Sequence, residues 1–296
     1  MIPFTKAHAC GNDFLIVTEE AAQGRDPAEL TRRLCARNSG VGADGVEFFA
    51  WTGPNSGRIR LHNADGSIAE ISGNGTRCVA AWMARERGLH PGDKLRIETD
   101  AGLRLCHVNA LKTDGAFTVE VTSGMGVPSF EQRTVKLPEQ YAEWGLRLCG
   151  QGRIEPSKSE AEIAIRGLFV SMGNPHFVLC MNDAMLQKCG HTWSELGAEI
   201  CFHRDFPSQT NVEFVQVTSP NEIEIRIFER GVGPTYSSGT GTSACATAAI
   251  ALYGCQSPLT VVAPGGAQTV EWDGPGAELR LTGPASLVAR GEAWPA

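Results

Sequence analysis

Residues 72–82 read SGNGTRCVAAW and residues 238–249 read SGTGTSACATAA, so one phrase occurs twice, 166 positions apart. Each copy has a serine, a Gly-x-Gly-Thr turn and a run rich in alanine. A glycine-rich turn that opens a helix exposes backbone N–H groups at the positive end of the helix dipole. The two copies therefore predict an internal duplication in which each half builds one anion-binding helix start.

Composition excludes several classes of protein. The 296 residues carry a net charge of −7 without a long basic run, which argues against nucleic-acid binding. No apolar stretch approaches the ~18–20 residues of a membrane span, and the first residues, MIPFTKAHACGNDF, lack the pattern of a signal peptide. Ten cysteines without a C-x-x-C pair favour buried, reduced thiols in a cytoplasmic protein over disulfides or a metal site.

Capping signals predict four helices. One begins at Asp26-Pro27, two follow Gly75 and Gly241, and a weaker one has Thr192 and Glu195 as a capping pair. The strands predicted from residue type and alternation are Phe14–Val17, Gly45–Ala50, Arg58–His62, Leu95–Thr99, Leu103–Val108, Phe117–Val121, Glu162–Ile165, Phe177–Met181, Val212–Val217, Glu222–Phe228, Leu259–Val262 and Thr269–Trp272.

Because strands dominate, we expect an α+β fold with mostly antiparallel sheets wrapped on central helices. The helices after Gly75 and Gly241 are predicted to end at Gly88 and Gly254. Residues 125–140, MGVPSFEQRTVKLPEQ, are predicted as a loop-rich boundary between the two halves.

The twin turns suggest a reaction. Two helix starts that face one cleft could hold one amino-acid carboxylate and would place Ser72 and Ser238 on opposite faces of the bound molecule. One group would then remove an α-proton and the other would return a proton to the opposite face, which inverts the stereocentre. Neither turn fits a phosphate-loop or dinucleotide fingerprint. Acyl transfer by serine would need an ordered histidine base, which nothing near either serine supplies.

Several polar phrases could line such a cleft, although Asn, Asp, Gly and Pro are also ordinary turn residues. Glu229 and Arg230 end the alternating stretch EIEIRIFE, and together they could hold an ammonium and a carboxylate group. The other candidates are Asn12, Asp13, Asn63, Asp65, Asn174, His176 and Asn211.

The phrases HACGNDF, NADGS, SGNGTRC, SMGNPH, NVEFV and ERGVGPTYSSGTGTSACA occur in the order and approximate spacing of the diaminopimelate epimerases, which the chain resembles from residue 4 to about residue 285. The resemblance implies two pseudo-symmetric domains, each a mostly antiparallel barrel-like sheet around a central helix, with the active site between them. We place one domain at residues 1–125, with residues 283–296 returning to it, and the other at 126–282.

The resemblance also implies the activity. These enzymes interconvert LL- and meso-2,6-diaminopimelate for lysine and cell-wall synthesis, without a cofactor such as pyridoxal phosphate, and are usually homodimers. Carried over by motif, His176 lies beside the acid/base of the first turn and Glu229 beside that of the second. Gly73, Asn74, Gly239 and Thr240 cradle the reacting carboxylate, and the distal end of the substrate is held by Asn12, Asn63, Asn174, Asn211, Glu229 and Arg230.

The chain departs from the family at both acid/base positions, where serine replaces cysteine. The pKa of a serine hydroxyl is higher than that of a thiol by roughly five units. Forming the serine anion therefore costs about 7 kcal/mol more, which would slow proton transfer by ~10⁵ if nothing compensates. A serine therefore needs an adjacent base, for which His176 and Glu229 are candidates. Cys10, Cys78 and Cys245 are predicted to be packing residues, and further departures occur at Ser39, Gly45, Pro234 and Ser237.

Three interpretations of the serines follow. The leading one is an epimerase of diaminopimelate in which Ser72 and Ser238 transfer the protons. The alternatives are a racemase of another amino acid in the same fold and a non-catalytic protein that binds an amino acid. The serines are either native or substitutions made to trap a substrate, and the further departures around the site favour a divergent native branch.

Overall fold

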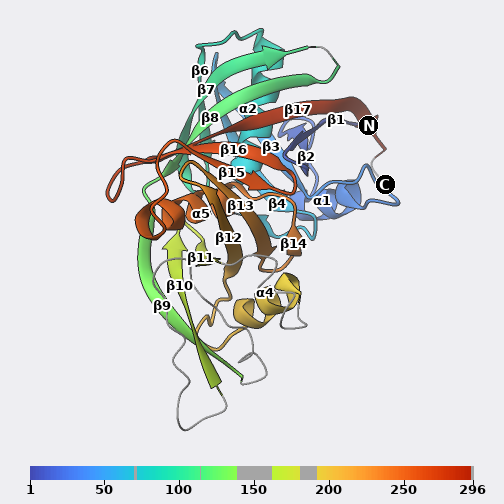
Figure 1. The fold of residues 1–296 in the computed structure, drawn as a ribbon. Coiled ribbons are helices and arrows are strands. Elements are labelled where there is room, and N and C mark those ends of the chain that lie inside the picture. Colours follow the sequence, from blue (N-terminus) through green and yellow to red (C-terminus); the bar gives the residue numbers. More distant parts are fainter. Residues whose placement is uncertain (70–71, 114, 139–161, 181–191, 295–296) are drawn as a thin grey trace. The chain divides into compact units, whose positions relative to one another are not determined.

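The computed structural model describes residues 1–69, 72–113, 115–138, 162–180 and 192–294 (Figure 1). The chain divides into two compact units. Unit 1 comprises Met1–Met125 and Arg280–Ala296, and unit 2 comprises Gly126–Leu279.

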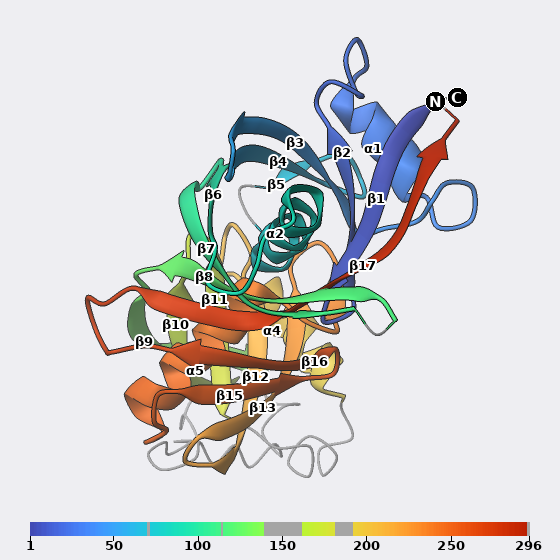
Figure 2. The same ribbon diagram turned by 90° about the horizontal axis from the view of Figure 1, so that it is seen from above.

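The principal strands of unit 1 are β1 (Ile2–Ala9), β2 (Asn12–Thr18), β3 (Gly45–Gly53), β4 (Ser56–Asn63), β6 (Lys94–Thr99), β7 (Gly102–Lys112), β8 (Phe117–Gly126) and β17 (Leu279–Ala293), and the short β5 (Ile68–Ala69) pairs with β4. They pair in the order β1-β2-β3-β4-β6-β7-β8, and β17 closes the ring by pairing with both β8 and β1. The β2–β3 and β4–β6 pairs are parallel. The result is a closed barrel, seen along its axis in Figure 2.

The strands of unit 2 are β9 (Ser129–Pro138), β10 (Glu162–Ser171), β11 (Pro175–Cys180), β12 (Asn211–Ser219), β13 (Glu222–Glu229), β15 (Leu259–Ala263) and β16 (Gly266–Glu271), and the short β14 (Gly233–Thr235) pairs with β13. They pair in the order β9-β10-β11-β12-β13-β15-β16. The parallel pairs, β11–β12 and β13–β15, flank the antiparallel pair β12–β13, just as β2–β3 and β4–β6 flank the antiparallel pair β3–β4 in unit 1. The internal duplication predicted from the twin phrases is therefore present in the strand pairing.

The same duplication holds for the helices, which are α1 (Pro27–Cys35) and α2 (Gly73–Arg87) in unit 1 and α4 (Trp193–Cys201) and α5 (Gly239–Leu252) in unit 2. Strands β3 and β12 have equal lengths and begin 166 positions apart, as do β4 and β13, and α2 and α5 begin at the same offset. The segment from β3 to the start of α2 is thus repeated without an insertion.

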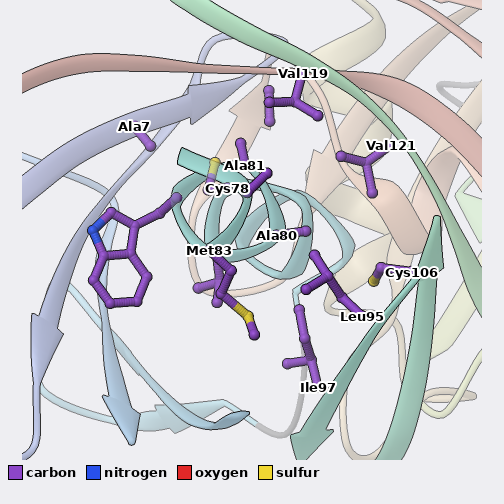
Figure 3. Packing of buried hydrophobic residues seen from close by; sticks show 14 of the residues in the cluster. Ala7, Cys78, Ala80, Ala81, Met83, Leu95, Ile97, Cys106, Val119 and Val121 are labelled. Atoms are coloured by element: carbon purple, nitrogen blue, oxygen red, sulfur yellow. The ribbon is translucent and has the colours of Figure 1, made fainter. Parts of the chain in front are cut away.

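Helix α2 fills the barrel of unit 1. Its residues Gly73 to Ala84 are all buried, because an alanine-rich helix is thin enough to be enclosed by strands on every side. Met83 is fully buried and lies on the α2 face toward Leu95 and Ile97 in Figure 3. Helix α5 is likewise buried from Gly239 to Ala249. A helix that is apolar on all sides needs such an interior position.

The structure confirms the predicted fold class and most of the elements. The start of α1, with Asp26 as N-cap, the capping box of Thr192 and Glu195, and the left-handed end of α2 at Gly88 are all as predicted. Both central helices begin three residues earlier than predicted, at the first glycine of each turn.

Three long strands, β1, β9 and β17, were absent from the prediction. The prediction of a loop at residues 125–140 is wrong for Ser129–Pro138, which form β9 and pair with all of β10. Val135 and Leu137 of this strand are buried, but the polar stretch Glu131–Thr134, Lys136, and the prolines at 128 and 138 weakened the strand signal. Met181 of the predicted strand Phe177–Met181 lies outside the described residues.

The packing of α2 gives a stability prediction. Met83→Ala should lower the free energy of unfolding by about 2–5 kcal/mol, because the enclosed position cannot collapse onto the smaller side chain. Val288→Ala, on the 54% exposed Val288 of β17, is the control and should change it by less than about 0.5 kcal/mol. Urea denaturation measures both, and equal effects would contradict the enclosed position of α2.

Candidate active site: two serine-capped helix starts backed by buried glutamates

Each of the two serines is the N-cap of a central helix. Ser72 Oγ accepts a hydrogen bond from Gly75 N at 3.0 Å, and Ser238 Oγ accepts one from Gly241 N at 3.3 Å. Both serines have extended backbone, as N-caps normally do. The first N–H groups of each helix, at Gly73 and Gly239, have no acceptor within the helix and are suited to an anion.

A strand glutamate packs under each helix start. Glu47 on β3 and Glu213 on β12 each precede their serine by 25 positions, and both are fully buried. A Cβ atom added at Gly75 would lie 2.0 Å from Glu47 Oε1, and one added at Gly241 would lie 3.0 Å from Glu213 Oε1. The second glycine of each Gly-x-Gly turn therefore makes room for a carboxyl group.

In unit 2, hydrogen bonds connect the buried carboxyl group to the serine. Glu213 Oε1 lies 2.6 Å from His176 Nδ1, and His176 Nε2 lies 3.0 Å from Asn174 Oδ1. Asn174 Nδ2 donates to Thr240 Oγ1 at 3.3 Å, and Thr240 Oγ1 lies 3.4 Å from Ser238 Oγ. A carboxamide orients its neighbours but does not readily pass a proton, so this chain holds His176 and the start of α5 in a fixed arrangement.

In unit 1, the corresponding asparagine belongs to a different network. Asn74 Nδ2 donates to Asn12 Oδ1 at 3.2 Å, and Asn12 Nδ2 donates to Asp44 Oδ2 at 2.7 Å. The guanidinium of the fully buried Arg77 donates to Asn74 Oδ1. At the far end of this hydrogen-bond network, Arg37 Nη2 lies 2.7 Å from Asp44 Oδ1. The network orients Asn12 and Asn74 over the start of α2 but does not include Glu47.

Neighbouring charges fix Asp13 beside Asn12. Lys6 and Arg37 each bind Asp13 at 2.9 Å. Although burial raises the pKa of Asp13, hydrogen bonds and charges from Arg37 and Lys6 outweigh it and lower that pKa. Asp13 therefore supports the Asn12 loop as a carboxylate.

Glu47 has no partner where Glu213 has His176. In the parallel pairs, His176 lies opposite Asn211 of β12, and Phe14 occupies the matching place opposite Gly45 of β3. Both oxygens of Glu47 lack a hydrogen-bond partner among the residues that the structure describes. Burial alone raises the pKa of Glu47 to about 8.

The structure places the remaining predicted substrate-binding residues at strand ends. Asn63 ends β4, is exposed, and donates to Ser67 Oγ at 3.0 Å. Asn211 begins β12 and accepts from Arg230 N at 3.0 Å, while Arg230 Nη1 donates to Ser208 O at 3.2 Å. Glu229 ends β13 and is half-buried.

The structure leaves untested the two predicted contacts of the serines, which are His176 beside Ser72 and Glu229 beside Ser238. His176 lies in unit 2, where it is linked to the turn of Ser238, and its predicted position beside Ser72 would join the two units and stays a prediction. The predicted proximity of Glu229 to Ser238 also stays a prediction.

The cysteines behave as core residues. The eight described cysteines are all buried. Burial raises the pKa of Cys78 and Cys245, which keeps both thiols protonated. A cavity of about 870 Å³ lies beside α1 and is lined in part by Arg25, Ser39 and Trp294. Neither serine turn borders it, so the cavity plays no part in this site.

In the described part of the chain, no cluster of three or more His, Cys, Asp or Glu side chains could hold a metal ion. No helix in that part is long and apolar enough to cross a membrane.

Sequence reasoning missed Glu47 and Glu213. A glutamate in an alternating strand is usually exposed, so the interpretation of TNVEF stopped at Asn211. The signal was nevertheless present, because GVEF at 45–48 and NVEF at 211–214 repeat at the same 166-residue offset as the two turns.

Comparison with known proteins gives a consistent result. The family model described as diaminopimelate epimerase matches residues 4–131 and 168–288. Proteins named diaminopimelate epimerase from Desulforudis audaxviator and Thermosynechococcus vestitus are 38% and 36% identical to this chain, with 98% of each chain covered in both comparisons.

Solved structures share the fold at lower identity. A predicted epimerase from Pseudomonas aeruginosa has a TM-score of 0.69 at 14% identity, with 99% of both chains covered. A probable proline racemase from Agrobacterium radiobacter K84 has a TM-score of 0.67 at 16% identity, covering 99% of this chain and 92% of the other.

The contact between Gly75 and Glu47 can be tested by a double-mutant cycle. Gly75→Ala should destabilise the protein by about 1–3 kcal/mol, because the new methyl group meets Glu47 Oε1. Combined with Glu47→Ala, the same substitution should cost much less, since the carboxyl group is gone. Additive losses in urea denaturation would contradict the contact.

The raised pKa of Glu47 predicts a pH-dependent stability. The unfolded chain releases this proton near the ordinary value of 4.5, whereas the folded protein holds it up to about pH 8. Relative to Glu47→Gln, the wild type should therefore lose stability as pH rises from about 4.5 to about 8. The loss is about 1.4 kcal/mol per pH unit at most.

Urea denaturation of both proteins at pH 5, 6.5 and 8 measures this difference. The control is Glu19→Gln, in the exposed ion pair between Glu19 and Arg58, and its offset from the wild type should stay nearly constant. If the difference in unfolding free energy between Glu47→Gln and the wild type also stays constant with pH, Glu47 is not a protonated acid in the folded protein.

Proposed function

Because the chain belongs to the diaminopimelate epimerase family, we propose that it interconverts LL- and meso-2,6-diaminopimelate by cofactor-independent proton transfer at one α-carbon. Family membership identifies the chain as an isomerase. The observation that supports the mechanism is the pair of buried helix starts, each capped by a serine and each built by the same segment of the duplicated fold.

Ser72 and Ser238 are assigned to the two acid/base positions. One serine removes the α-proton, and the other delivers a proton to the carbanion that remains. The N–H groups at Gly73 and Gly239, with the positive helix ends, stabilise the negative charge that grows toward the α-carboxylate. Asn74 and Thr240 are the second residues of the two helices and complete the cradle.

The other predicted residues are assigned to substrate recognition. Arg230 presents an exposed guanidinium suited to a carboxylate, and Glu229 at the preceding position is suited to an ammonium group. Asn12, Asn63, Asn174 and Asn211 hold the distal amino-acid end. His176, fixed by Glu213, is assigned to Ser72, and Glu229 is assigned to Ser238, as the proton acceptors that an unactivated serine lacks.

We further propose that the protein works in the cytoplasm as a homodimer and that units 1 and 2 are its two domains. The free thiols of Cys35, Cys78, Cys106, Cys201, Cys245 and Cys255 fit a reducing compartment. Light scattering coupled to size-exclusion chromatography tests the dimer, and a monomeric mass would reject it.

The reaction is tested by α-deuterium uptake in D₂O with LL- and meso-diaminopimelate and a panel of other amino acids. We expect exchange at one α-centre of diaminopimelate. Exchange only with another amino acid would favour a racemase of that compound in the same fold. Binding measured by calorimetry, with no exchange of any substrate, would reject catalysis and favour an amino-acid-binding protein.

Substitution of the serines tests their assignment. Ser72→Cys with Ser238→Cys should raise turnover by orders of magnitude, because thiols reach the anionic state at much lower cost. Ser72→Ala and Ser238→Ala should each abolish epimerisation while the protein still folds. Epimerisation that survives both alanine substitutions would remove the serines from the mechanism.

A further inference from the structure

Arg77 on α2 is a buried cation close to the start of the helix. Its side chain is fully buried, and Arg77 Nη2 donates to Asn74 Oδ1. Arg77 Nε and Nη1 have no hydrogen-bond partner among the residues that the structure describes. Because long side chains on a helix point toward its N-terminus, this contact places the guanidinium at the first turn of α2, behind the side chain of its second residue.

No carboxylate pairs with Arg77 in the described part of the chain. The titratable groups that interact with it are the thiols of Cys10, Cys78 and Cys106, and the buried acid Glu47 is not among them. Burial raises the pKa of Cys78 and Cys106, so these two thiols stay neutral. Burial also lowers the pKa of Arg77, but a guanidinium in a protein keeps its proton. The start of α2 therefore carries a positive charge that these groups do not balance.

The second half of the molecule shows that the fold does not require this charge. Ser243 of α5 stands 166 positions after Arg77, which is the offset that relates the two turns. Ser243 Oγ donates to Gly239 O at 2.9 Å, within its own helix. A central helix thus forms in unit 2 without a cation at this position, whereas unit 1 keeps one although its desolvation is costly.

The proposed reaction supplies the missing negative charge. Gly73 and Asn74 at the start of α2 are assigned to the cradle of the reacting carboxylate. When the α-proton passes to the acid/base serine, the electron pair left on carbon spreads into this carboxylate, which then carries more negative charge than in the bound substrate. A fixed positive charge behind the cradle stabilises this state more than it stabilises the bound substrate.

We propose that Arg77 is a positioning residue of the first half-site, which fixes the Asn74 side chain and supplies the positive charge that stabilises the substrate carboxylate as the α-proton leaves. This inference rests on the proposed function and deepens it. Arg77 acts through Asn74 and through its electric field, because a fully buried side chain does not itself contact the substrate. In the second half-site Thr240 is held by Asn174, a neutral carboxamide, so the two ends of the cradle differ in charge.

The test compares Arg77→Met, which removes the charge, with Arg77→Lys, which keeps the charge but lacks the planar fork. Initial rates of α-deuterium uptake are measured with LL- and meso-diaminopimelate. For Arg77→Met we expect kcat to fall about 10- to 100-fold and KM to rise less than about threefold, because the carboxylate gains its extra charge in the transition state. Arg77→Lys should recover most of the lost kcat.

Thermal unfolding separates this role from a structural one. Removal of an unpaired buried charge should leave the unfolding midpoint of Arg77→Met unchanged or raise it, since methionine needs no counter-charge. Arg85→Met is the matched control. Arg85 lies on the same helix, is exposed, and has its guanidinium carbon 5.2 Å from the centre of the Phe117 ring. There the same substitution should leave kcat and KM within about twofold of the wild type.

A second measurement detects the charge without a substrate. In the Ser72→Cys background, the pH dependence of iodoacetamide alkylation at position 72, followed by peptide mass spectrometry, gives the pKa of the introduced thiol. Addition of Arg77→Met should raise that thiol pKa by about 0.5–1 unit, because a nearby positive charge favours the thiolate. Addition of Arg77→Lys or Arg85→Met should leave the thiol pKa unchanged.

The outcomes separate the two proposals. The role of Arg77 is overturned, and the function left intact, if Arg77→Met leaves kcat unchanged, if Arg77→Lys does not recover the loss, or if the loss accompanies a lower unfolding midpoint. A thiol pKa that Arg77→Met does not change also overturns that role. Exchange only with a different amino acid overturns the substrate, and the same variants are then compared with that compound. A wild type that exchanges the α-proton of no amino acid overturns both proposals.

Discussion

The approach of a buried carboxyl group to the second glycine of a helix turn is the constraint on which both halves depend. Glu47 leaves no room for a side chain at Gly75, and Glu213 would have to shift by a few tenths of an ångström to admit one at Gly241. A turn without side chains lets the helix begin inside the barrel, where its first N–H groups are shielded from water. The same glycine therefore allows the strand, the helix start and the serine cap to occupy one small volume.

The two halves share this arrangement of strand glutamate, glycine turn and serine cap, but they differ in the residues that surround it. Asn12 bonds to Asn74 in unit 1, and Asn174 bonds to Thr240 in unit 2, so an asparagine from the preceding loop contacts the second helical residue in each. The difference is the residue beside the glutamate. His176 converts Glu213 into part of an imidazole–carboxylate pair, whereas Phe14 leaves Glu47 a solitary acid. Equivalent backbones thus hold a carboxyl group paired with an imidazole in one half and an unpaired carboxyl group in the other.

The sequence predicted the parts of the fold that depend on local signals. Asp26, Thr192 and Gly88 mark helix ends through hydrogen bonds or backbone angles within a few residues, so their roles could be inferred directly. Strand β17 could not be predicted in this way, because Gly283 and Pro284 within it are poor strand residues and its place is set by pairing with β1 and β8. The serine turns were visible as a repeated phrase. The buried glutamates were not, because the burial of a strand glutamate is decided by a helix that lies 25 positions later in the chain.

The free energy of proton transfer explains why a serine in these turns needs a neighbouring proton acceptor. A serine in place of a cysteine must recover about 7 kcal/mol if its anion is to form as readily. The positive end of a helix contributes at most about 2 kcal/mol, and an N–H donor to the charged oxygen contributes about 1.5–3 kcal/mol. As N-caps, Ser72 and Ser238 receive both contributions, the helix dipole and the N–H donor. Their sum is still smaller than the 7 kcal/mol that a serine must recover. The remainder can be avoided only if the serine never becomes a free alkoxide, which requires an acceptor that takes its proton in the same step. The candidates that we propose for that acceptor are His176, whose Nδ1 lies 2.6 Å from Glu213 Oε1, and Glu229.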